Sequence, residues 1–196
     1  MGMGIAANQV ACIVLAAGRS ERFGTADKLA AELCGKPLLH HVLETLNSFD
    51  FAQKIIVCQP TTLDVAGLGF DRVDVDRAEG LQSDSLRTGI RALRTAPLAG
   101  ILFALGDMPA VSRNHIRRLL EQFDAHDERC VVASDMDDAR VPPALFAIGL
   151  VDDLADMVGD TGARSLLRKA VLVRASRAEL LDVDTPDDLE RAWKRS

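Results

Sequence analysis

The chain has 196 residues, which is enough for one domain with its own core and no metal or disulfide support. Apolar residues make up 48% of the sequence and charged residues 27%, as in ordinary globular proteins. The formal net charge of −6 argues against binding to nucleic acid or to an acidic membrane through general electrostatic attraction. An anionic ligand must therefore be held by locally placed basic side chains or by a metal ion.

The N-terminal residues and the cysteines predict a cytoplasmic protein. Residues 1–9 contain neither a basic region nor a long apolar segment, so no secretory signal is recognisable, and the longest apolar runs are too short to span a bilayer. The four cysteines are widely spaced, and three of them lie in or beside apolar runs, which is typical of reduced thiols in a protein core.

Strand-like and helix-like segments alternate along the chain. Continuous apolar runs, typical of buried strands, occur at 10–17, 53–58, 71–76, 99–105, 129–134, 144–148, 171–174 and 179–183. Helical periodicity occurs at 37–47, 84–94, 112–123, 150–157, 161–169 and 186–194. This order predicts one α/β domain over 1–196, a three-layer α/β/α structure with a mostly parallel, Rossmann-like sheet. We expect residues 1–9 to be flexible and 134–160 to form an insertion or lid.

Ligands of such sheets bind beyond the carboxyl ends of the strands, and the first strand ends in LAAGRSERFGTADK at residues 15–28. The glycine spacing matches neither the Walker P-loop nor the dinucleotide-binding fingerprint. A glycine-bearing turn can still present backbone N–H groups to phosphate oxygens, and Arg19, Arg22 and Lys28 can neutralise their charge. A plain connecting loop is the alternative interpretation of this segment taken alone.

A second strand end, ILFALGDMPAVS at 101–112, carries Asp107. An apolar strand that runs into Gly-Asp places this carboxylate at the ligand edge of the sheet. Carboxylate oxygens are suitable ligands for Mg²⁺, which is commonly shared with substrate phosphates. Capping of the next helix does not require Asp107, because Ser112 can serve as its N-cap.

The C-terminal segment ELLDVDTPDDLERAW at 179–193 carries a pair of acids, Asp182 and Asp184. Thr185 and Pro186 are explained by the start of a helix, where such residues are favoured. Two carboxylates two residues apart on a strand can face the same side and would repel one another. The pair therefore predicts a cation nearby.

The pattern LAAG-R-x-x-R-x-G-x-x-x-K, followed by L-x-G-K-P-L-L at 33–39, resembles the MobA-like NTP transferase family. It is most similar to the molybdenum cofactor cytidylyltransferases and more loosely to the sugar-nucleotide pyrophosphorylases. The resemblance implies that the first loop wraps the triphosphate of an NTP. On this match the nucleotide is contacted by Leu15, Ala16, Ala17 and Gly18, and the phosphates are held by Arg19 and Lys28.

The same resemblance extends over nearly the whole chain and implies further site residues. GDMP matches the family's metal-binding aspartate, Asp107, and DVDTP supplies a second metal ligand, for which we favour Asp184 over Asp182. EGLQSDSLRTG at 79–89 resembles the segment that lines the base and ribose pocket, which implies nucleotide contacts from Gly80, Gln82, Ser83 and Ser85. The acceptor segment departs from the family, with ARVPPALF at 139–146 where a glycine and a polar residue are usual. The implied acceptor residues are Pro143, Phe146, Gly162, Ala163 and Arg164.

The resemblance implies a Mg²⁺-dependent nucleotidyltransferase that joins an NTP to a phosphorylated acceptor, with molybdopterin favoured, and that releases pyrophosphate. Catalysis would rest on Arg19, Lys28 and Asp107. Ala17, where the guanylyltransferase has glycine, favours CTP, with GTP as the alternative. A sugar phosphate is an alternative acceptor, and transient contact with a molybdoenzyme is a further expectation. Alternatives of other classes are a nicotinamide-dependent oxidoreductase and a non-catalytic partner in molybdoenzyme maturation.

Overall fold

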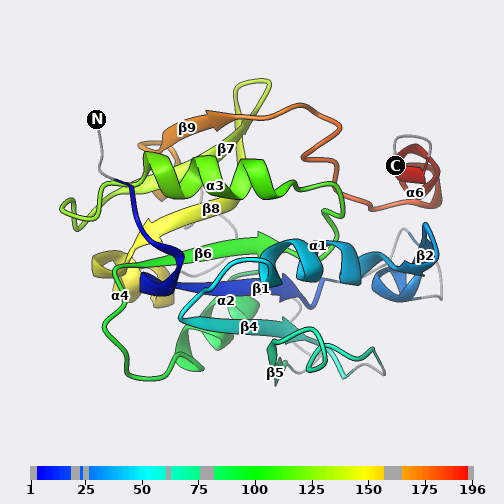
Figure 1. The fold of residues 1–196 in the computed structure, drawn as a ribbon, viewed down its shortest axis with the longest axis horizontal. Coiled ribbons are helices and arrows are strands. Elements are labelled where there is room, and N and C mark those ends of the chain that lie inside the picture. The colour runs from blue at the N-terminus through cyan, green and yellow to red at the C-terminus, as the bar shows by residue number, and fades with distance from the viewer. Residues whose placement is uncertain are drawn as a thin grey trace.

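The computed structural model describes residues 4–18, 23, 27–60, 63–75, 82–156 and 165–193. These residues form a central seven-stranded sheet in the order β5-β4-β1-β6-β8-β7-β9 (Figure 1). The strands are β1 Val10–Ala16, β4 Gln53–Cys58, β5 Asp71–Asp74, β6 Gly100–Leu105, β7 Val131–Met136, β8 Ala139–Ala147 and β9 Val171–Arg174. A separate small sheet pairs β2 Glu32–Leu33 with β3 Lys36–Pro37.

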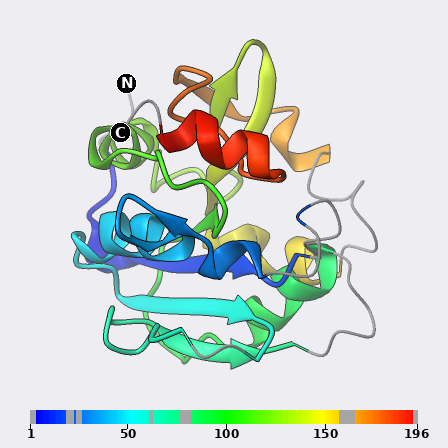
Figure 2. The same cartoon turned by 90° about the vertical axis from the view of Figure 1, so that its right-hand side faces the viewer.

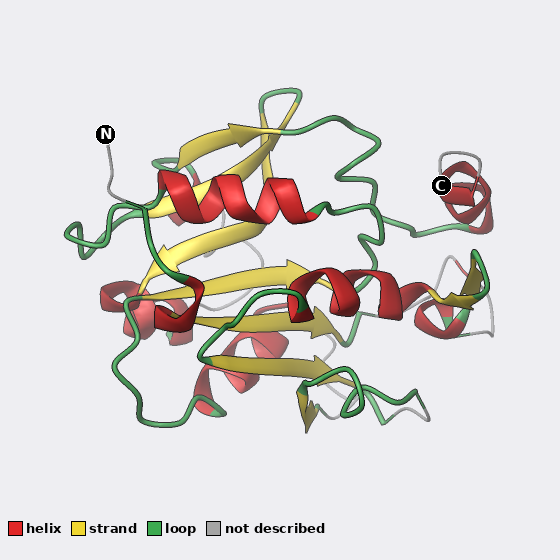
Figure 3. Cartoon of the chain, in the orientation of Figure 1, coloured by secondary structure: helices red, strands yellow, loops and turns green. Residues whose placement is uncertain are grey.

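Helices cover both faces of the sheet, as Figure 3 shows. The α-helices are α1 Leu38–Asn47, α2 Gln82–Arg91, α3 Arg113–Gln122, α4 Val151–Ala155 and α6 Pro186–Trp193, and the short 3-10 helices are η1 Ala7–Gln9, η3 Lys28–Ala30 and η4 Ile148–Leu150. Apolar side chains of α1 and α3 pack on one face of the sheet, and those of α2 and α4 pack on the other. The predicted three-layer α/β/α fold is confirmed.

The strands nearest the middle of the sheet are parallel because each is followed by a crossover. β1 pairs in parallel with β4 on one side and with β6 on the other, and all seven residues of β1 are buried. Continuous burial explains why this strand reads as an unbroken apolar run. At the carboxyl-end edge of the sheet, the C-terminal helix α6, drawn in red in Figure 2, contacts the small strand β2.

Part of the segment that we expected to be an insertion or lid belongs to the central sheet. β8 lies between β6 and β7 and runs antiparallel to both. Its pattern is hard to recognise in sequence because its first residues, Ala139 and Arg140, are exposed in a hairpin and two prolines follow them. Burial, and with it the apolar pattern, begins at Pro143.

Two other expectations differ from the structure. The run 179–183 forms turns and extended backbone and no strand, because Leu180 and Val183, three residues apart, are the buried ones, and no alternation results. The first residues are fixed from residue 4 onward: Ile5 is buried, and its N–H donates to the carbonyl of Leu120 at the end of α3. In the described part of the chain, no helix is long and apolar enough to cross a membrane.

Candidate active site

The carboxyl ends of β1 and β6 lie side by side at the edge where the candidate residues gather. The N–H of Gly106 donates to the carbonyl of Leu15 at 2.9 Å. A Cβ atom at residue 106 would come within 3.0 Å of the side chains of Ala16 and Leu39. Glycine therefore permits the close approach that positions Asp107 next to the first loop.

Lys28 lies between two carboxylates at this edge. Its Nζ is 2.7 Å from Asp107 Oδ2 and 3.0 Å from Asp184 Oδ1, and its side chain is only 6% exposed. Lys28 opens η3, which Asp27 caps by accepting a hydrogen bond from the N–H of Leu29. Lys28, Asp107 and Asp184 thus form one charged cluster, although Lys28 and Asp184 are 156 positions apart in the sequence.

The two carboxylates determine the charge state of this lysine. Burial by itself would lower the pKa of Lys28, but the attraction and hydrogen bond of Asp107, followed by those of Asp184, raise it above the ordinary lysine value. Lys28 is therefore a fixed positive charge at neutral pH, placed where anionic groups of a substrate could reach it.

Local backbone structure brings Asp184 to the cluster. The N–H of Val183 donates to the carbonyl of Asp107 at 2.9 Å, which ties the C-terminal segment to the loop after β6. Directly afterwards, Thr185 and Asp188 cap the start of α6 reciprocally: the Asp188 N–H donates to Thr185 Oγ1, and the Thr185 N–H donates to Asp188 Oδ2. The helix start that the sequence predicts therefore positions Asp184 next to Lys28.

The donor set fits a divalent cation that is shared with a substrate. Asp107 Oδ1 is buried and has no hydrogen-bond partner among the described residues, so an acceptor atom with nothing to pair with lies beside Asp184. Among the residues that the structure describes, no three acidic, histidine or cysteine side chains gather closely enough to hold a metal by themselves. Mg²⁺ commonly takes one or two carboxylates and completes its shell with water and phosphate oxygens.

Asp182 differs from Asp184 in its surroundings. Desolvation by nearby protein atoms, together with the negative charges of Asp107 and Asp184, raises its pKa to about 6. Asp184, by contrast, shares Lys28 with Asp107. These contacts favour Asp184 over Asp182 as the second metal ligand.

Polar groups that follow β1 and β4 and that begin α2 could contact a nucleotide. The carbonyl of Ala17 accepts a hydrogen bond from Gln59 Nε2 at 3.3 Å. Ser83 and Ser85, at the start of α2, are buried, and Ser83 Oγ has no partner within the described segments. A buried hydroxyl without a partner is costly unless a ligand or water satisfies it. Leu15, Ala16 and Ala17 are buried at the end of β1, and Gly18 has open space where a side chain would be.

Several predicted site residues lie outside the described residues. They are Arg19, Arg22, Gly80, Gly162, Ala163 and Arg164, and the same is true of the side chain of Gln82. Their roles stay predictions.

A pocket of about 530 Å³ has Asp182 in its lining. Its lining is largely apolar, with Asp182 at the end nearest the charged cluster and with an ion pair between Arg177 and Asp137. The remaining lining residues are Leu105, Met108, Met136, Ala139, Val141, Pro142, Leu180 and Leu181. The charges of Asp107 and Asp184 act on Asp182, so the pocket adjoins the charged cluster.

The two acceptor residues predicted in β8 do not line this pocket. Phe146 is buried in the core, with its ring 5.7 Å from that of Phe103 in an edge-to-face arrangement. Phe146 packs in the core on the face covered by α2 and α4, and its neighbour Leu145 packs in the core on the opposite face. Pro143 is buried behind Pro142, which does line the pocket.

Sequence reasoning missed residues on both sides of the cluster. Gln59 follows the buried strand β4, so its place at a carboxyl end was a usable signal. Arg177 and Asp137 come from segments with no recognisable motif and meet only because β7, β8 and the segment after β9 are brought together by the sheet. No sequence pattern could have identified that ion pair.

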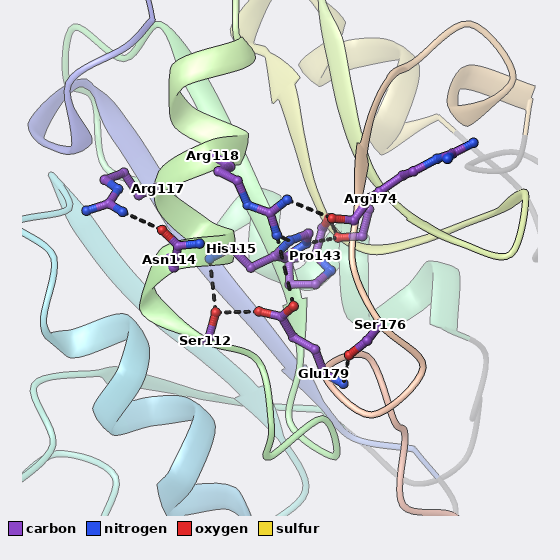
Figure 4. Close-up of polar contacts among 10 residues, drawn as sticks. Ser112, Asn114, His115, Arg117, Arg118, Pro143, Arg174, Ser176 and Glu179 are labelled. Carbon is purple, nitrogen blue, oxygen red and sulfur yellow. Dashed lines mark hydrogen bonds and ion pairs between the residues drawn. The ribbon is translucent and has the colours of Figure 1, made fainter.

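A buried polar network connects α3 with β7 and β8 (Figure 4). His115 Nε2 lies 2.7 Å from Ser134 Oγ, which donates to the carbonyl of Pro143, also at 2.7 Å. Because that carbonyl can only accept, the serine hydroxyl must accept from His115, which therefore carries its proton on Nε2. The guanidinium of Arg118 then donates to His115 Nδ1 at 3.0 Å.

Acid should weaken this network. Burial lowers the pKa of His115, with Arg118 acting in the same direction and Glu179 opposing it. The unfolded chain thus binds more protons than the folded protein just below the ordinary histidine pKa, and stability falls as the pH drops. Between about pH 7 and pH 5, we expect the Tm of the wild type to fall about 2–4 °C more than that of His115→Gln. Thermal unfolding at both pH values measures this, and equal losses would contradict it.

Comparison with known proteins agrees with this geometry. A family model described as the MobA-like NTP transferase domain matches residues 12–177. The purine catabolism protein PucB of Bacillus subtilis is 28% identical over 195 residues, covering 91% of this chain and 93% of PucB. A probable molybdenum cofactor guanylyltransferase of Haloferax mediterranei is 35% identical over 201 residues, covering 93% of this chain and 92% of the relative.

Solved structures show the same fold. The structure of Rv0371c from Mycobacterium tuberculosis superposes with a TM-score of 0.80 at 27% identity, covering 96% of this chain and 100% of that chain. A nucleotidyl transferase from Methanothermobacter, Mth528, gives a TM-score of 0.78 at 25% identity, covering 96% of this chain and 97% of that chain. With a family model that matches most of its length, the chain belongs to the MobA-like NTP transferase family and is a nucleotidyltransferase.

Proposed function

We propose that the protein transfers a nucleotidyl group from an NTP to a phosphorylated acceptor of the molybdenum cofactor type, with Mg²⁺ as cofactor. The observation that carries the proposal is the convergence of Lys28, Asp107 and Asp184. This cluster lies between the nucleotide side, at Ala17 and Ser83, and the pocket that ends at Asp182. Such an arrangement suits two anionic substrates that meet at one charged centre.

In this mechanism, an oxygen of the acceptor phosphate attacks the α-phosphorus of the NTP, and the bond to the β-phosphate oxygen breaks as pyrophosphate leaves. Asp107 and Asp184 would hold the metal, and the bound metal would neutralise charge that develops at the α-phosphate. Lys28 supplies a fixed positive charge for the departing pyrophosphate. An ionised acceptor phosphate needs no general base, and positioning of the two substrates accounts for the remaining catalysis.

A divalent metal is also supported by a relative. Rv0371c has been solved in a complex with manganese, and that structure superposes on this chain with a TM-score of 0.77 at 25% identity. For this protein we propose Mg²⁺, because the available ligands are carboxylate oxygens. We further propose that the product passes by transient contact to a molybdoenzyme.

The nucleotide has two candidates. CTP is supported by Ala17, whose Cβ at the end of β1 limits how closely a base can approach the backbone and so favours a pyrimidine. GTP is supported by relatives that are named molybdenum cofactor guanylyltransferases, in Haloferax mediterranei and Burkholderia vietnamiensis among others.

Pyrophosphate release tests the proposal directly. The protein is mixed with Mg²⁺ and with CTP, GTP, UTP or ATP, in the presence and absence of molybdopterin. We expect release that needs both Mg²⁺ and molybdopterin and that is fastest with CTP or GTP. The absence of release with every nucleotide would refute the function, and release with a sugar phosphate alone would change the acceptor.

Substitution of Ala17 tests the argument for CTP. In Ala17→Gly the missing Cβ leaves more room for a purine, so we expect the CTP-to-GTP ratio of kcat/KM to fall about tenfold. Steady-state kinetics with both nucleotides measures the ratio. If the ratio does not change, Ala17 has no part in base choice.

A further inference from the structure

Besides Leu105 and Met108, the pocket next to Asp182 has two walls that come from different parts of the chain. The first wall is the β7-β8 hairpin, including Met136, Val141 and Pro142. The second wall is the segment 177–182. An exposed ion pair between Asp137 and Arg177 connects the walls on the surface, where such pairs contribute little.

Helix α3 is bonded to the first wall through side chains that are completely buried. His115 and Ser134 are both 0% exposed. Arg118 donates to His115, His115 donates to Ser134, and Ser134 donates to the carbonyl of Pro143. The pairing of β7 with β8 shifts register at Ala133/Ser134, opposite the two prolines. The two prolines fall outside the regular ladder, and the carbonyl of Pro143 accepts a hydrogen bond from the side chain of Ser134.

The same helix is bonded to β9 and to the second wall. Arg118 donates to the carbonyl of Arg174 at 2.7 Å, and Ser112 Oγ donates to the carboxylate of Glu179. Ser112 also accepts from the N–H of His115, so the N-cap of α3 joins both sets of contacts. Figure 4 shows His115, Arg118 and Glu179 converging at this end of the helix.

We propose that His115 and Ser134 are positioning residues for the second substrate: through α3 they fix the spacing between the two walls of the pocket and thereby select the acceptor. The polar side-chain atoms of His115 and Ser134 are all paired, and such buried groups hold a single geometry because a change of geometry leaves them unpaired. Among the described residues, the hydrogen bonds of the network reach neither Lys28 nor Ser83. Its effect should therefore fall on the acceptor alone. This inference rests on the proposed function.

The kinetic test compares Ser134→Ala and His115→Leu with the wild type, with molybdopterin as the varied acceptor. We expect the KM for molybdopterin to rise about tenfold in each variant, while the KM for the nucleotide changes less than about twofold. His115→Gln should recover most of the loss, because its amide can donate to Ser134 and accept from Arg118. Equal changes in both KM values, or none, would overturn the inference.

Matched controls come from helix α1. His41 Nε2 lies 2.8 Å from the carbonyl of Leu33, and Ser48 Oγ donates to the carbonyl of Thr45. Neither residue lines the pocket. His41→Leu and Ser48→Ala make the same side-chain changes away from the pocket and also remove hydrogen bonds, and we expect the acceptor KM to stay within about twofold of the wild-type value.

A second measurement separates this inference from the proposed function. Hydrogen exchange followed by mass spectrometry needs no substrate. In Ser134→Ala, we expect the amides of 136–141 and of 177–182 to exchange at least about tenfold faster, with β1 and β4 unchanged. If molybdopterin is not a substrate, this result still supports the role of the network. Unchanged or uniformly faster exchange would refute it even in an active enzyme.

Discussion

Asp107→Ala should abolish turnover while the fold persists. Asp107 contributes a buried oxygen that has no partner among the described residues, and its other oxygen accepts a hydrogen bond from Lys28. Its removal leaves the metal with Asp184 as its remaining proposed ligand. We expect a loss in kcat of about 10³-fold or more, the effect of deleting a group that stabilises charge in the transition state. Pyrophosphate release in saturating Mg²⁺ measures this loss, and circular dichroism verifies the fold.

Asp74→Asn is the matched control for this change. Asp74 also ends a parallel strand of the sheet, but its carboxylate pairs with Arg72 and is exposed. We expect kcat within about twofold of the wild-type value, because exposed pairs contribute little. Full Mg²⁺-dependent activity in Asp107→Ala, or an equal loss in Asp74→Asn, would exclude the assignment of Asp107 as a metal ligand.

Lys28→Met should weaken both nucleotide binding and the folded state. Loss of a charge-assisted contact to phosphate is expected to lower NTP affinity about 10- to 100-fold, as measured by calorimetry. The change also leaves Asp107 and Asp184 without their shared cation, at a cost of about 1–3 kcal/mol in unfolding free energy, since both are partly exposed. Divalent metal should recover part of this stability, because it replaces the lost positive charge.

The thermal shift caused by Mg²⁺ or Mn²⁺ alone is the sharpest form of this prediction. We expect a larger rise in Tm in Lys28→Met than in the wild type, because in the wild type the Lys28 ammonium competes with the metal for the same carboxylates. Lys54→Met, which removes an exposed lysine bonded to Asn47, serves as the control and should behave like the wild type. Equal metal shifts in all three proteins would show that Lys28 and the metal do not share these oxygens.

Much of the nucleotide side of the site could be predicted from the sequence. β1 and β6 read as apolar runs because both are buried on two faces, and their carboxyl ends carry Gly18 and Asp107. The start of α6 was recognisable from Thr185 and Pro186, and its cap is what directs Asp184. Local rules were sufficient here, because each residue belongs to a strand end or a helix start with a clear pattern.

The acceptor side could not be predicted in the same way. The resemblance placed Phe146 in the acceptor site, but side-chain alternation in β8 directs it into the core. The pocket is built from Pro142, Arg177 and Leu180, which come together through strand pairings that are distant in sequence. His115 appeared as one histidine in an amphipathic helix, and its role depends on Ser134 and Arg118 in three dimensions.

The reversed direction of β8 divides the sheet into parts that can change separately. β5, β4, β1 and β6 form a continuous parallel unit that carries the proposed nucleotide side, while β8, β7 and β9 lie on the side of the proposed acceptor pocket. Because β8 runs the other way, it reaches the ligand edge with its first residues, in a tight hairpin whose Asp137 and Asp138 have φ of 51° and 66°. A hairpin tip can vary in sequence without disturbing the crossovers that build β1 and β6. New acceptors are therefore accessible to this architecture by exchange of a few hairpin residues, while the chemistry of nucleotide activation stays as it is.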